Sequence, residues 1–569
     1  MKKLYTFFAA MLSCASIFSQ EALKSTEEEY YDFLSLQGLA ERPTLGYRTL
    51  SDSEWTLTEE AKTADENVWK NNSLGSKWTV YEPAQKTDNF FTRGIDQSIK
   101  VKIYGPEWFN SYNTAAPYGQ NDGALWQGKG YNTSFTAGAR LEAYGLEATF
   151  KPQLSFSQNR EFDIMPSAYD SEYGYFWGYG DNKGVDAPQR FGDKAFWTYD
   201  WGDTEIRYTW HNFTTGAGFQ NPWLGPAWLN PMLGSNNASS YPKIDAGLRR
   251  TKTYIPFCNW YIGDIEGRIW TGLLTESDYF DTNPSNDKRM LNAISASYMP
   301  SFIPNFSIGI NRIFITDWST HNIKYIPRLF TLSRSNGSQT GTKEDEDQKL
   351  SLFIDWQFPK VGFEFYGELG IDDFTSQERA NPFHTAIYTI GAKQSFPLVL
   401  SKIHPKFQDL KSEIIFEWNN FEMSQDFQMQ WRYMGYYAHS SISQGYTQKG
   451  QLLGSGSGYF GNSQFLGYKI YFSKGYIMPF FHRHCPDNNF IYNIPVGNAI
   501  DSGSDEYKKY YGKFHTCIAI GGEANYFITN NLNLSALFSI IPTDFPMYDN
   551  DGINDSMNYN GRLTLKYNF

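Results

Sequence analysis

The sequence predicts an all-β transmembrane barrel of the outer-membrane type, with about 18 antiparallel strands and a short α-helical N-terminal part. Phe, Tyr and Trp make up 18% of the 569 residues, charged residues make up 19%, and many strand-length segments alternate between apolar and polar residues. Barrels of this type combine an outward apolar band, aromatic girdles and a polar interior. The mean hydropathy is −0.52, and no run of about 18 apolar residues occurs after the N-terminus. Both observations exclude a bundle of transmembrane helices.

The charge balance restricts the classes of partner. The 61 acidic and 49 basic residues give a formal net charge of −12 at pH 7. Nucleic-acid binding is favoured by a basic excess, which this chain lacks, so we expect no nucleic-acid partner. A polyanion held by bulk charge alone is also disfavoured.

Residues 1–20 are typical of a secretory signal peptide. Lys2 and Lys3 supply a positive start, residues 4–18 are mostly apolar, and Ser19-Gln20 forms a small-to-polar junction. Cleavage there removes two lysines and no acid, which takes the net charge from −12 to −14. We therefore predict that the mature protein lies in the outer membrane of a Gram-negative bacterium.

The cysteines leave two alternatives open. Ser13 before Cys14 fits a lipobox, which would make the protein a lipoprotein, although the residues before Ser13 fit poorly. The mature chain retains Cys258, Cys485 and Cys517, an odd number without close spacing. A disulfide framework is therefore not the organising device, and one long-range bridge stays possible.

Residues 21–88 form a predicted helical periplasmic N-terminal region. Ser25 with Glu28 is typical of a capped helix start, and the apolar spacing continues to about Gly38. A second helix is predicted from Ser51 to about Asn72. A small periplasmic cap and a domain that contacts a partner both stay open as roles for this region.

Residues 89–569 form the predicted barrel. Apolar and polar residues alternate in 134–142, and again in 350–356, 363–371, 514–526 and 532–538. A soluble sandwich also alternates but rarely carries charged pairs and tyrosines so regularly on its second face. A barrel places them in its lumen, where the following residues can pair or fill space: Arg140, Glu142, Arg268, Trp270, Glu364, Tyr366, Glu368 and Glu523.

Acidic connections such as 278–287 and 333–346 are predicted to be exposed outer loops, whereas 529–531 is predicted to be a tight periplasmic turn. In the last strand, Leu563, Leu565, Tyr567 and Phe569 alternate with polar residues, and the chain stops on an aromatic residue. This strand is similar to the C-terminal insertion signal of bacterial outer-membrane proteins. The similarity implies contact with the barrel-assembly machinery and with outer-membrane lipid.

Several motifs resemble the Wzi family of outer-membrane capsule-assembly proteins. They are residues 121–132 (NDGALWQGKGYN), the Gly-, Asn- and Pro-rich stretch 218–237, and residues 438–454 (AHSSISQGYTQKGQLLG). The resemblance implies an 18-stranded barrel, a helical part on the periplasmic side, and a lectin-like role in retaining capsular polysaccharide or exopolysaccharide at the cell surface. The acidic segments 343–347 and 549–555 depart from the enterobacterial form, which leaves the sugar specificity open.

Sugar binding requires flat aromatic faces beside amides, carboxylates or arginines. The candidate polysaccharide-binding residues are of this kind, in one dense loop cluster and in two of the resembling motifs. They are Trp177, Tyr179, Asp181, Asn182, Asn121, Asp122, Trp126, His439 and Tyr446. Girdle aromatics or structural residues of the barrel wall are the alternative interpretation of each.

The sequence predicts no enzyme. No Gly-x-Ser-x-Gly elbow and no His-Glu-x-x-His helix is present, and Glu364 and Glu368 on one strand lie about 13 Å apart, too far for a glycosidase pair. His482 and His484 share one strand face but lack a third ligand in the sequence. We expect no cofactor, and calcium at residues 549–552 stays open.

The predicted function is therefore that of an outer-membrane lectin that attaches or assembles surface polysaccharide without covalent catalysis. A passive or substrate-selective channel and a scaffold within an envelope export machine are the alternatives.

Overall fold

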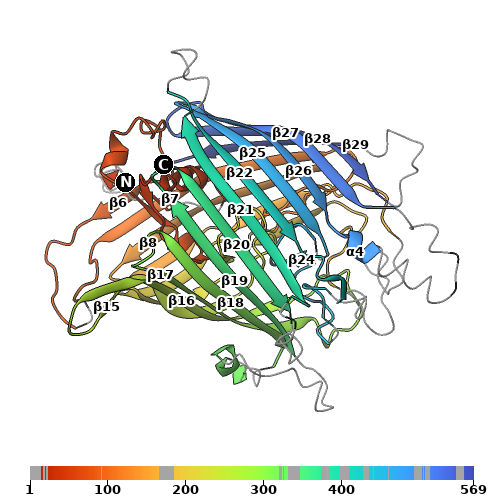
Figure 1. The fold of residues 1–569 in the computed structure, drawn as a ribbon, viewed down its shortest axis with the longest axis horizontal. Coiled ribbons are helices and arrows are strands. Elements are labelled where there is room, and N and C mark those ends of the chain that lie inside the picture. Colours follow the sequence, from red (N-terminus) through yellow and green to blue (C-terminus); the bar gives the residue numbers. More distant parts are fainter. Residues whose placement is uncertain are drawn as a thin grey trace, which may run out of the picture.

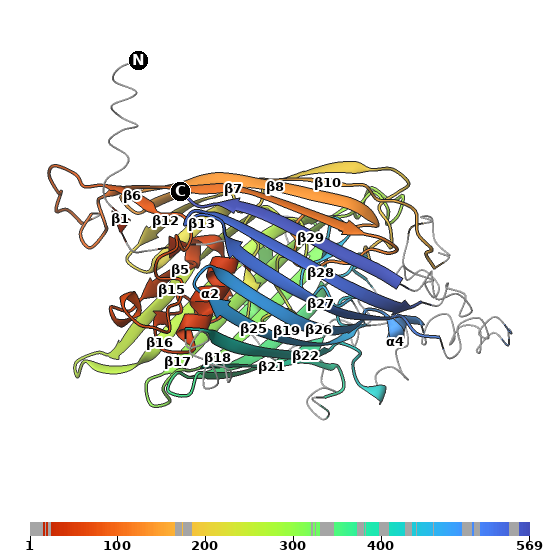
Figure 2. The same ribbon diagram turned by 90° about the horizontal axis from the view of Figure 1, so that it is seen from above.

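The computed structural model describes residues 15–16, 19–20, 24–90, 92–165, 173, 185–319, 323–324, 326–330, 346–372, 381, 383–397, 409–426, 435–439, 441–458, 460–491, 503, 505, 513–545 and 557–569. Its main feature is one large β-barrel, with the N-terminal segment at one end (Figures 1 and 2). The long strands of the wall are β7 (Ile99–Asn113), β8 (Gly130–Ala143), β9 (Leu146–Phe150), β10 (Gln153–Ser157), β11 (Phe196–Asp200), β12 (Glu205–Trp210), β13 (Phe213–Gly218), β15 (Lys243–Ile255), β16 (Trp260–Thr275), β17 (Lys288–Pro300), β18 (Phe306–Asp317), β19 (Glu346–Phe358), β20 (Phe363–Asp372), β21 (Ala386–Pro397), β22 (Lys411–Asn420), β25 (Asn462–Phe472), β26 (Gly475–Cys485), β27 (Thr516–Phe527), β28 (Leu532–Asp544) and β29 (Met557–Tyr567).

The sheet is antiparallel and closes on itself. β9 and β10 pair with successive parts of β8, so together they count as one spanning strand. β11 pairs with β10 and β12 pairs with β9, so these two strands also count as one. Counted in this way the wall has 18 strands, and β29 pairs with β7 to close it. Closure satisfies every edge, which a strand-built membrane protein requires. The predicted fold class is therefore confirmed.

The outer face of the wall is apolar, as the alternation predicted. Ile206 is 63% exposed, Ile244 62% and Ile520 59%, each on a different strand. So many apolar side chains facing outward would be unfavourable in water and are suited to contact with lipid hydrocarbon.

The two ends of the barrel differ in the length of the connections between the strands. One end, here called the short-turn end, carries 144–145, 211–212, 256–259, 301–305, 359–362, 473–474 and 528–531, with the longer 398–410. The opposite long-loop end carries 114–129, 158–195, 219–242, 276–287, 318–345, 373–385, 421–461, 486–515 and 545–556. The predicted turn at 529–531 is confirmed, whereas most of 333–346 lies outside the described residues.

The N-terminal segment contains the first predicted helix but not the second. Helix α2 (Thr26–Ser35) begins at Ser25, whose Oγ accepts a hydrogen bond from the backbone N of Glu28 at 3.2 Å, as predicted. The remaining elements of this segment and of the loops are η1 (Leu50–Asp52), η2 (Glu60–Lys62), η4 (Pro327–Phe330), α4 (Asn488–Ile491), β1 (Ala15–Ser16), β2 (Ser19–Gln20), β3 (Ala40–Glu41), β4 (Tyr47–Arg48), β5 (Glu54–Leu57), β6 (Trp78–Tyr81), β14 (Trp223–Leu224), β23 (Thr447–Gln448) and β24 (Gln451–Leu452). None of the helices among the described residues has the length and apolar character needed to cross a membrane.

The prediction of a helix from Ser51 to Asn72 is wrong. Residues 54–57 form strand β5, which pairs with β2 and β3 and is flanked by the short η1 and η2 turns. Trp55 is buried while Thr56 between it and Leu57 is exposed, so the local period is two and not 3.6. The carboxylate of Asp52 bonds barrel arginines, which removes it from any capping role.

The N-terminal segment lies inside the short-turn end and is held there by charge. Its acidic and basic side chains pair with inward-facing residues of the wall at 2.6–3.0 Å: Glu27 with Lys566, Glu29 with Lys469, Asp32 with Lys393, Arg42 with Asp355 and Glu364, and Asp52 with Arg249 and Arg268. The lumen thus provides the predicted pairing role for Arg268 and Glu364. Strand β6, which lies within residues 21–88, pairs with the start of β7 at the short-turn end of the barrel.

The pKa of Glu29 illustrates this docking. Burial alone would raise this pKa, but the positive charges of Lys24 and Lys469 together outweigh burial and lower the pKa to about 2. Tyr30 and Phe33 of the same helix pack on Tyr471 of the wall, with ring centroids 5.4 and 4.3 Å apart. Charge pairs and aromatic packing therefore fix α2 against the same wall strands.

We expect Asp52→Asn to loosen the docked segment. The change removes the charge that bonds Arg249 at 2.7 Å and Arg268 at 3.0 Å, and charged hydrogen bonds of this kind contribute about 1.5–3 kcal/mol. The measurement is the free energy of unfolding in denaturant, in detergent micelles. Glu59→Gln, in an exposed pair with Lys62, is the matched control and should change it by less than about 0.5 kcal/mol. Equal effects of both variants would contradict the docking argument.

Candidate functional site

The connection 219–242 folds into the lumen and is held by two wall carboxylates. Glu417 of β22 accepts hydrogen bonds from the backbone N of Trp228 at 2.7 Å, Leu229 at 3.0 Å and Asn230 at 2.7 Å. Glu368 of β20 accepts the backbone N of Ala227 and Met232, both at 3.2 Å. Each carboxylate thus satisfies the donors of a loop that would otherwise be unpaired inside the barrel.

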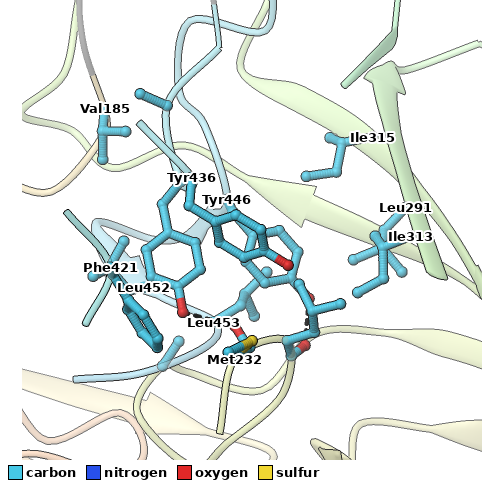
Figure 3. Packing of buried hydrophobic residues seen from close by; sticks show 14 of the residues in the cluster. Val185, Met232, Leu291, Ile313, Ile315, Phe421, Tyr436, Tyr446, Leu452 and Leu453 are labelled. Carbon is cyan, nitrogen blue, oxygen red and sulfur yellow. Dashed lines mark hydrogen bonds between the residues drawn. The ribbon is translucent and has the colours of Figure 1, made fainter. Parts of the chain in front are cut away.

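A second inward segment, 435–458, packs on the first. The hydroxyl of Tyr437 donates to the carbonyl of Met232 at 2.7 Å, and that of Tyr446 donates to the carbonyl of Leu233 at 2.5 Å. These aromatic rings lie with Leu291, Ile313 and Ile315 of the wall in one buried cluster (Figure 3). Tyr366 and Trp270 are also buried, so the prediction of a partly filled interior is confirmed.

A cavity of about 400 Å³ remains between these inward loops and the opposite wall. It lies against β26, β27, β28 and β29 and beneath the 114–129 loop. Its lining includes Tyr118, Asn121, Asp122, Trp126, Gln127, Trp228, Phe480, His482, His484, His515, Cys517, Glu523 and Arg562. We call it the loop-end cavity.

A second cavity of about 350 Å³ adjoins it toward the short-turn end and reaches Lys24 and Ser25. The two cavities share Asn121, Asp122, Glu523, Leu537 and Arg562 as lining residues. Two of the predicted site residues, Asn121 and Asp122, therefore line the same part of the lumen as Arg562 of β29.

The structure brings Asn121, Asp122 and Trp126 together at the loop-end cavity. Asn121 has a φ of +61°, a conformation that asparagine tolerates better than most residues, and its Nδ2 donates to the carbonyl of Leu229 at 3.0 Å. Asp122 accepts a short hydrogen bond from Nε2 of Gln127. The ring of Trp126 packs on Phe191 with centroids 5.0 Å apart.

Asn121, Asp122 and Arg562 form a corner that both cavities share. The electrostatics of this corner favour hydrogen bonding over ion pairing. Burial raises the pKa of Asp122, while Arg562 and the bond from Gln127 act in the opposite direction. Arg562 donates from Nε to the side chain of Asn560 at 3.0 Å, and among the described residues no carboxylate lies within ion-pair distance of it. The corner therefore offers both a guanidinium and a carboxyl to a polar ligand.

Five polar atoms around the loop-end cavity are buried without a hydrogen-bond partner among the described residues: Oδ1 of Asn121, Nε1 of Trp126, Oε1 of Gln127, Nε2 of His482 and Nε2 of His484. Buried polar atoms are normally paired, since leaving one unpaired costs about 1–3 kcal/mol. Aromatic faces surround them, with Trp228 and Phe465 at 4.8 Å and Phe465 and Phe480 at 6.0 Å between ring centroids. Donors, acceptors and flat apolar faces in one concave site fit a ligand of mixed polarity.

The other candidates lie elsewhere. His439 accepts at Nδ1 from the backbone N of Ser441 and Ile442 at 3.1 and 3.2 Å, and both His439 and Tyr446 are buried in the inward segment, away from the cavity lining. Trp177, Tyr179, Asp181 and Asn182 lie outside the described residues, as does 549–552. The described part of the chain contains no group of three His, Cys, Asp or Glu placed to hold a metal ion, and its cysteines are free.

Tyr118, Trp228 and Arg562 were not predicted. Trp228 lies inside the 218–237 motif, so the motif itself could have directed attention to it. Arg562 is one polar residue of an alternating strand, and no local signal separates it from the others. Tyr118 is placed by its hydroxyl, which lies 3.1 Å from Nδ1 of His482 on a distant strand.

The fold and the site define a closed 18-stranded membrane barrel whose lumen is partly filled by its own chain and keeps a cavity of polar and aromatic side chains at its long-loop end. The family "Capsule assembly protein Wzi" matches residues 112–492. The chain belongs to this family, which confirms the predicted relationship. No curated protein sequence matches the chain.

The fold is supported by a solved structure with a TM-score above 0.5, and other solved barrels are similar at lower TM-scores. The Escherichia coli protein Wzi, described as an outer membrane protein involved in group 1 capsule assembly and as a carbohydrate-binding β-barrel, is 9% identical with a TM-score of 0.56, and the match covers 97% of this chain and all of that one. OccK7 of Pseudomonas aeruginosa is 10% identical with a TM-score of 0.37 over 82% of this chain and 98% of that one. OccAB4 of Acinetobacter baumannii is 9% identical with a TM-score of 0.36 over 84% and 99%.

We expect the purified protein to show no steady open steps in planar lipid bilayers, because the inward loops fill the lumen. Glu417→Ala should produce openings, since it removes the acceptor of three backbone N–H groups and each unpaired donor costs about 1–3 kcal/mol. Glu422→Ala is the matched control, because that carboxylate bonds Asn462 of the wall. Steady steps from the unaltered protein would contradict the filled lumen.

Proposed function

We propose that this protein is an outer-membrane lectin that binds a capsular polysaccharide or exopolysaccharide at its long-loop end and attaches it to the cell surface. The observation that carries the proposal is the loop-end cavity, where Asn121 and Trp126 present unpaired polar atoms beside aromatic faces. A sugar ring has apolar C–H faces and hydroxyls around its edge, so it suits a site of this composition.

Family membership supports the same function. The E. coli relative of this fold is described as carbohydrate-binding and as involved in group 1 capsule assembly. The orientation expected for this barrel also suits the proposal, because outer-membrane barrels place short turns in the periplasm and longer loops outside. The cavity would then open toward the polymer, and the N-terminal segment would lie at the periplasmic side.

A single cavity of about 400 Å³ is small compared with a long polymer. Retention would therefore come from many copies of the protein, each holding one short stretch of the same chain, so that weak individual contacts add up to a strong attachment. This mode of binding needs no catalytic step and no bulk positive charge.

The alternatives account for less. A channel requires an open lumen, whereas loops 219–242 and 435–458 occupy much of it among the described residues. A scaffold that docks through residues 21–88 would need that segment to be free, whereas Glu29, Asp32 and Asp52 pair with the wall.

The direct test measures polysaccharide partitioning in a deletion strain that carries variants of this protein. We expect Trp126→Ala to weaken binding of purified polymer by about tenfold, as an aromatic contact of about 1.4 kcal/mol would, and to move polymer from the cells into the medium at constant synthesis. Trp126→Phe keeps a smaller aromatic ring but loses Nε1–H, so it should retain part of the binding.

Trp197→Ala is the matched control. Trp197 is 66% exposed on the outer face of the wall, so its loss should leave polymer attachment unchanged. If polymer attachment is the same in the deletion strain and the parent, the lectin proposal fails.

We further propose that β29 is recognised by the barrel-assembly machinery through Leu563, Leu565, Tyr567 and Phe569, which all point to the outer face. Phe569→Ala should lower the amount of assembled protein in the outer membrane, measured by heat-modified mobility in gels. Tyr559→Ala removes an outward aromatic of the same strand, 43% exposed against 52% for Phe569, and should assemble normally. Equal losses would indicate a general loss of lipid contact instead.

A further inference from the structure

A second group of polar side chains lies on the wall of the loop-end cavity, where β26 ends and β27 begins. Nδ1 of His515 lies 2.9 Å from Oδ2 and 3.0 Å from Oδ1 of Asp487. The other ring nitrogen, Nε2, lies 3.8 Å from Sγ of Cys517. The order is carboxylate, imidazole, thiol, and both His515 and Cys517 line the cavity.

The imidazole is fixed from several sides. The backbone N of His515 donates to the side chain of Asn488 in α4 at 2.6 Å, and its ring packs against Phe545 with centroids 4.8 Å apart. Asp487 is fully buried. Burial alone lowers the pKa of His515, but the Asp487 carboxylate raises it well above its usual value, which makes the imidazole a stronger base.

The thiol has polar neighbours on the side away from His515. The hydroxyl of Thr543 donates to Sγ of Cys517 at 3.7 Å. Cys517 of β27 is the cross-strand partner of His484 on β26, so the two side chains lie next to each other on the same face. Nε2 of His484 has no hydrogen-bond partner among the described residues, and His484 also lines the cavity.

We propose that Cys517, His515 and Asp487 form a nucleophilic site that removes O-acyl groups from the polysaccharide. The arrangement is the one that acyl transfer requires, with a nucleophile next to a base and a carboxylate that orients the base. O-acyl esters are the carbonyl electrophiles that a polysaccharide can present to a thiol. The choice of a glycan as the substrate rests on the proposed function, whereas the chemistry of the thiol does not.

The reaction balances with water as the second substrate. His515 takes the thiol proton, the sulfur attacks the acyl carbonyl carbon, and the sugar oxygen leaves with the proton from His515, which gives a thioester on Cys517. Water then attacks the thioester carbonyl while His515 accepts its proton. His515 returns that proton to the sulfur, and the free carboxylic acid departs.

His484 has the place of an oxyanion donor in this scheme. A hydrogen bond from Nε2–H to the carbonyl oxygen would stabilise the negative charge that develops when the sulfur attacks. Asp487 acts only through His515 and is therefore a positioning residue.

The test uses the full-length protein in detergent with p-nitrophenyl acetate as the ester. We expect an acetyl group on the peptide that contains Cys517, found by mass spectrometry of acid-quenched protein, together with turnover that Cys517→Ala abolishes. His515→Asn should slow acetylation by about 100-fold or more. Asp487→Asn should slow it too, and Asp487→Glu should restore part of the rate, which a purely structural ion pair would not explain.

Cys258→Ala is the matched control. Cys258 is exposed in the 256–259 turn at the other end of the barrel, so its loss should leave the Cys517 reaction unchanged. Acetylation of Cys258 and Cys517 at equal rates, or a Cys517 rate that His515→Asn leaves unaltered, would overturn the proposal.

Glycan binding is measured on the same preparations, so that the two proposals can fail separately. Cys517→Ala should still bind O-acetylated polymer while the unaltered protein releases acetate from it. Binding without acetate release overturns the acyl-transfer proposal and leaves the lectin in place. Acetylation of Cys517 by the small ester without any glycan binding overturns the lectin and the choice of substrate.

Discussion

An 18-stranded barrel encloses a lumen that is too wide for the side chains of its own wall to fill. Barrels of about eight strands are filled by side chains, whereas those of 16–18 strands leave an aqueous channel. In the part of the chain that the structure describes, much of this space is taken up by the N-terminal segment and the inward loops 219–242 and 435–458. Since these stretches bring backbone donors into the interior, the wall must supply acceptors for them.

The wall supplies them as isolated carboxylates. Glu266 accepts the backbone N of Leu45, Gly46 and Tyr47 at 2.7–3.0 Å, in the same way that Glu417 and Glu368 hold the loop around Trp228. Because Glu368 and Glu417 lie on β20 and β22, the loop is drawn to that side of the barrel. The loop-end cavity is what remains against β26 to β29, so the position of the site follows from the position of its anchors.

The sequence predicts those features that depend on local spacing. The period of two predicts the wall strands and their apolar outer face, and Ser25 with Glu28 predicts α2. The second helix is wrong because β5 is placed by its pairing with β3, and Asp52 is placed by arginines of β15 and β16, so the partners lie outside the segment whose spacing predicted the helix. Tertiary pairing overrides local propensity in such a segment.

The same distinction applies to the site. Asn121, Asp122 and Trp126 come from one motif and meet at one cavity, so a local signal was sufficient to find them. Tyr118, Trp228 and Arg562 come from three distant segments that only barrel closure brings together. His439 and Tyr446 also belong to a motif, but His439 accepts hydrogen bonds within its own loop and Tyr446 bonds the loop at Leu233, which shows that a motif can record packing as well as binding.

The charge of the site limits how a polymer can be held. The chain is acidic overall, and the corner around Arg562 also contains Asp122 and Glu523. Long-range attraction of an acidic polymer is therefore weak, and screening by salt would change it little. Affinity must come from close contacts, namely ring faces and hydrogen bonds that replace the missing partners of Asn121 and Trp126. Such contacts are individually weak, and attachment of a long chain then depends on the number of barrels that hold it at once.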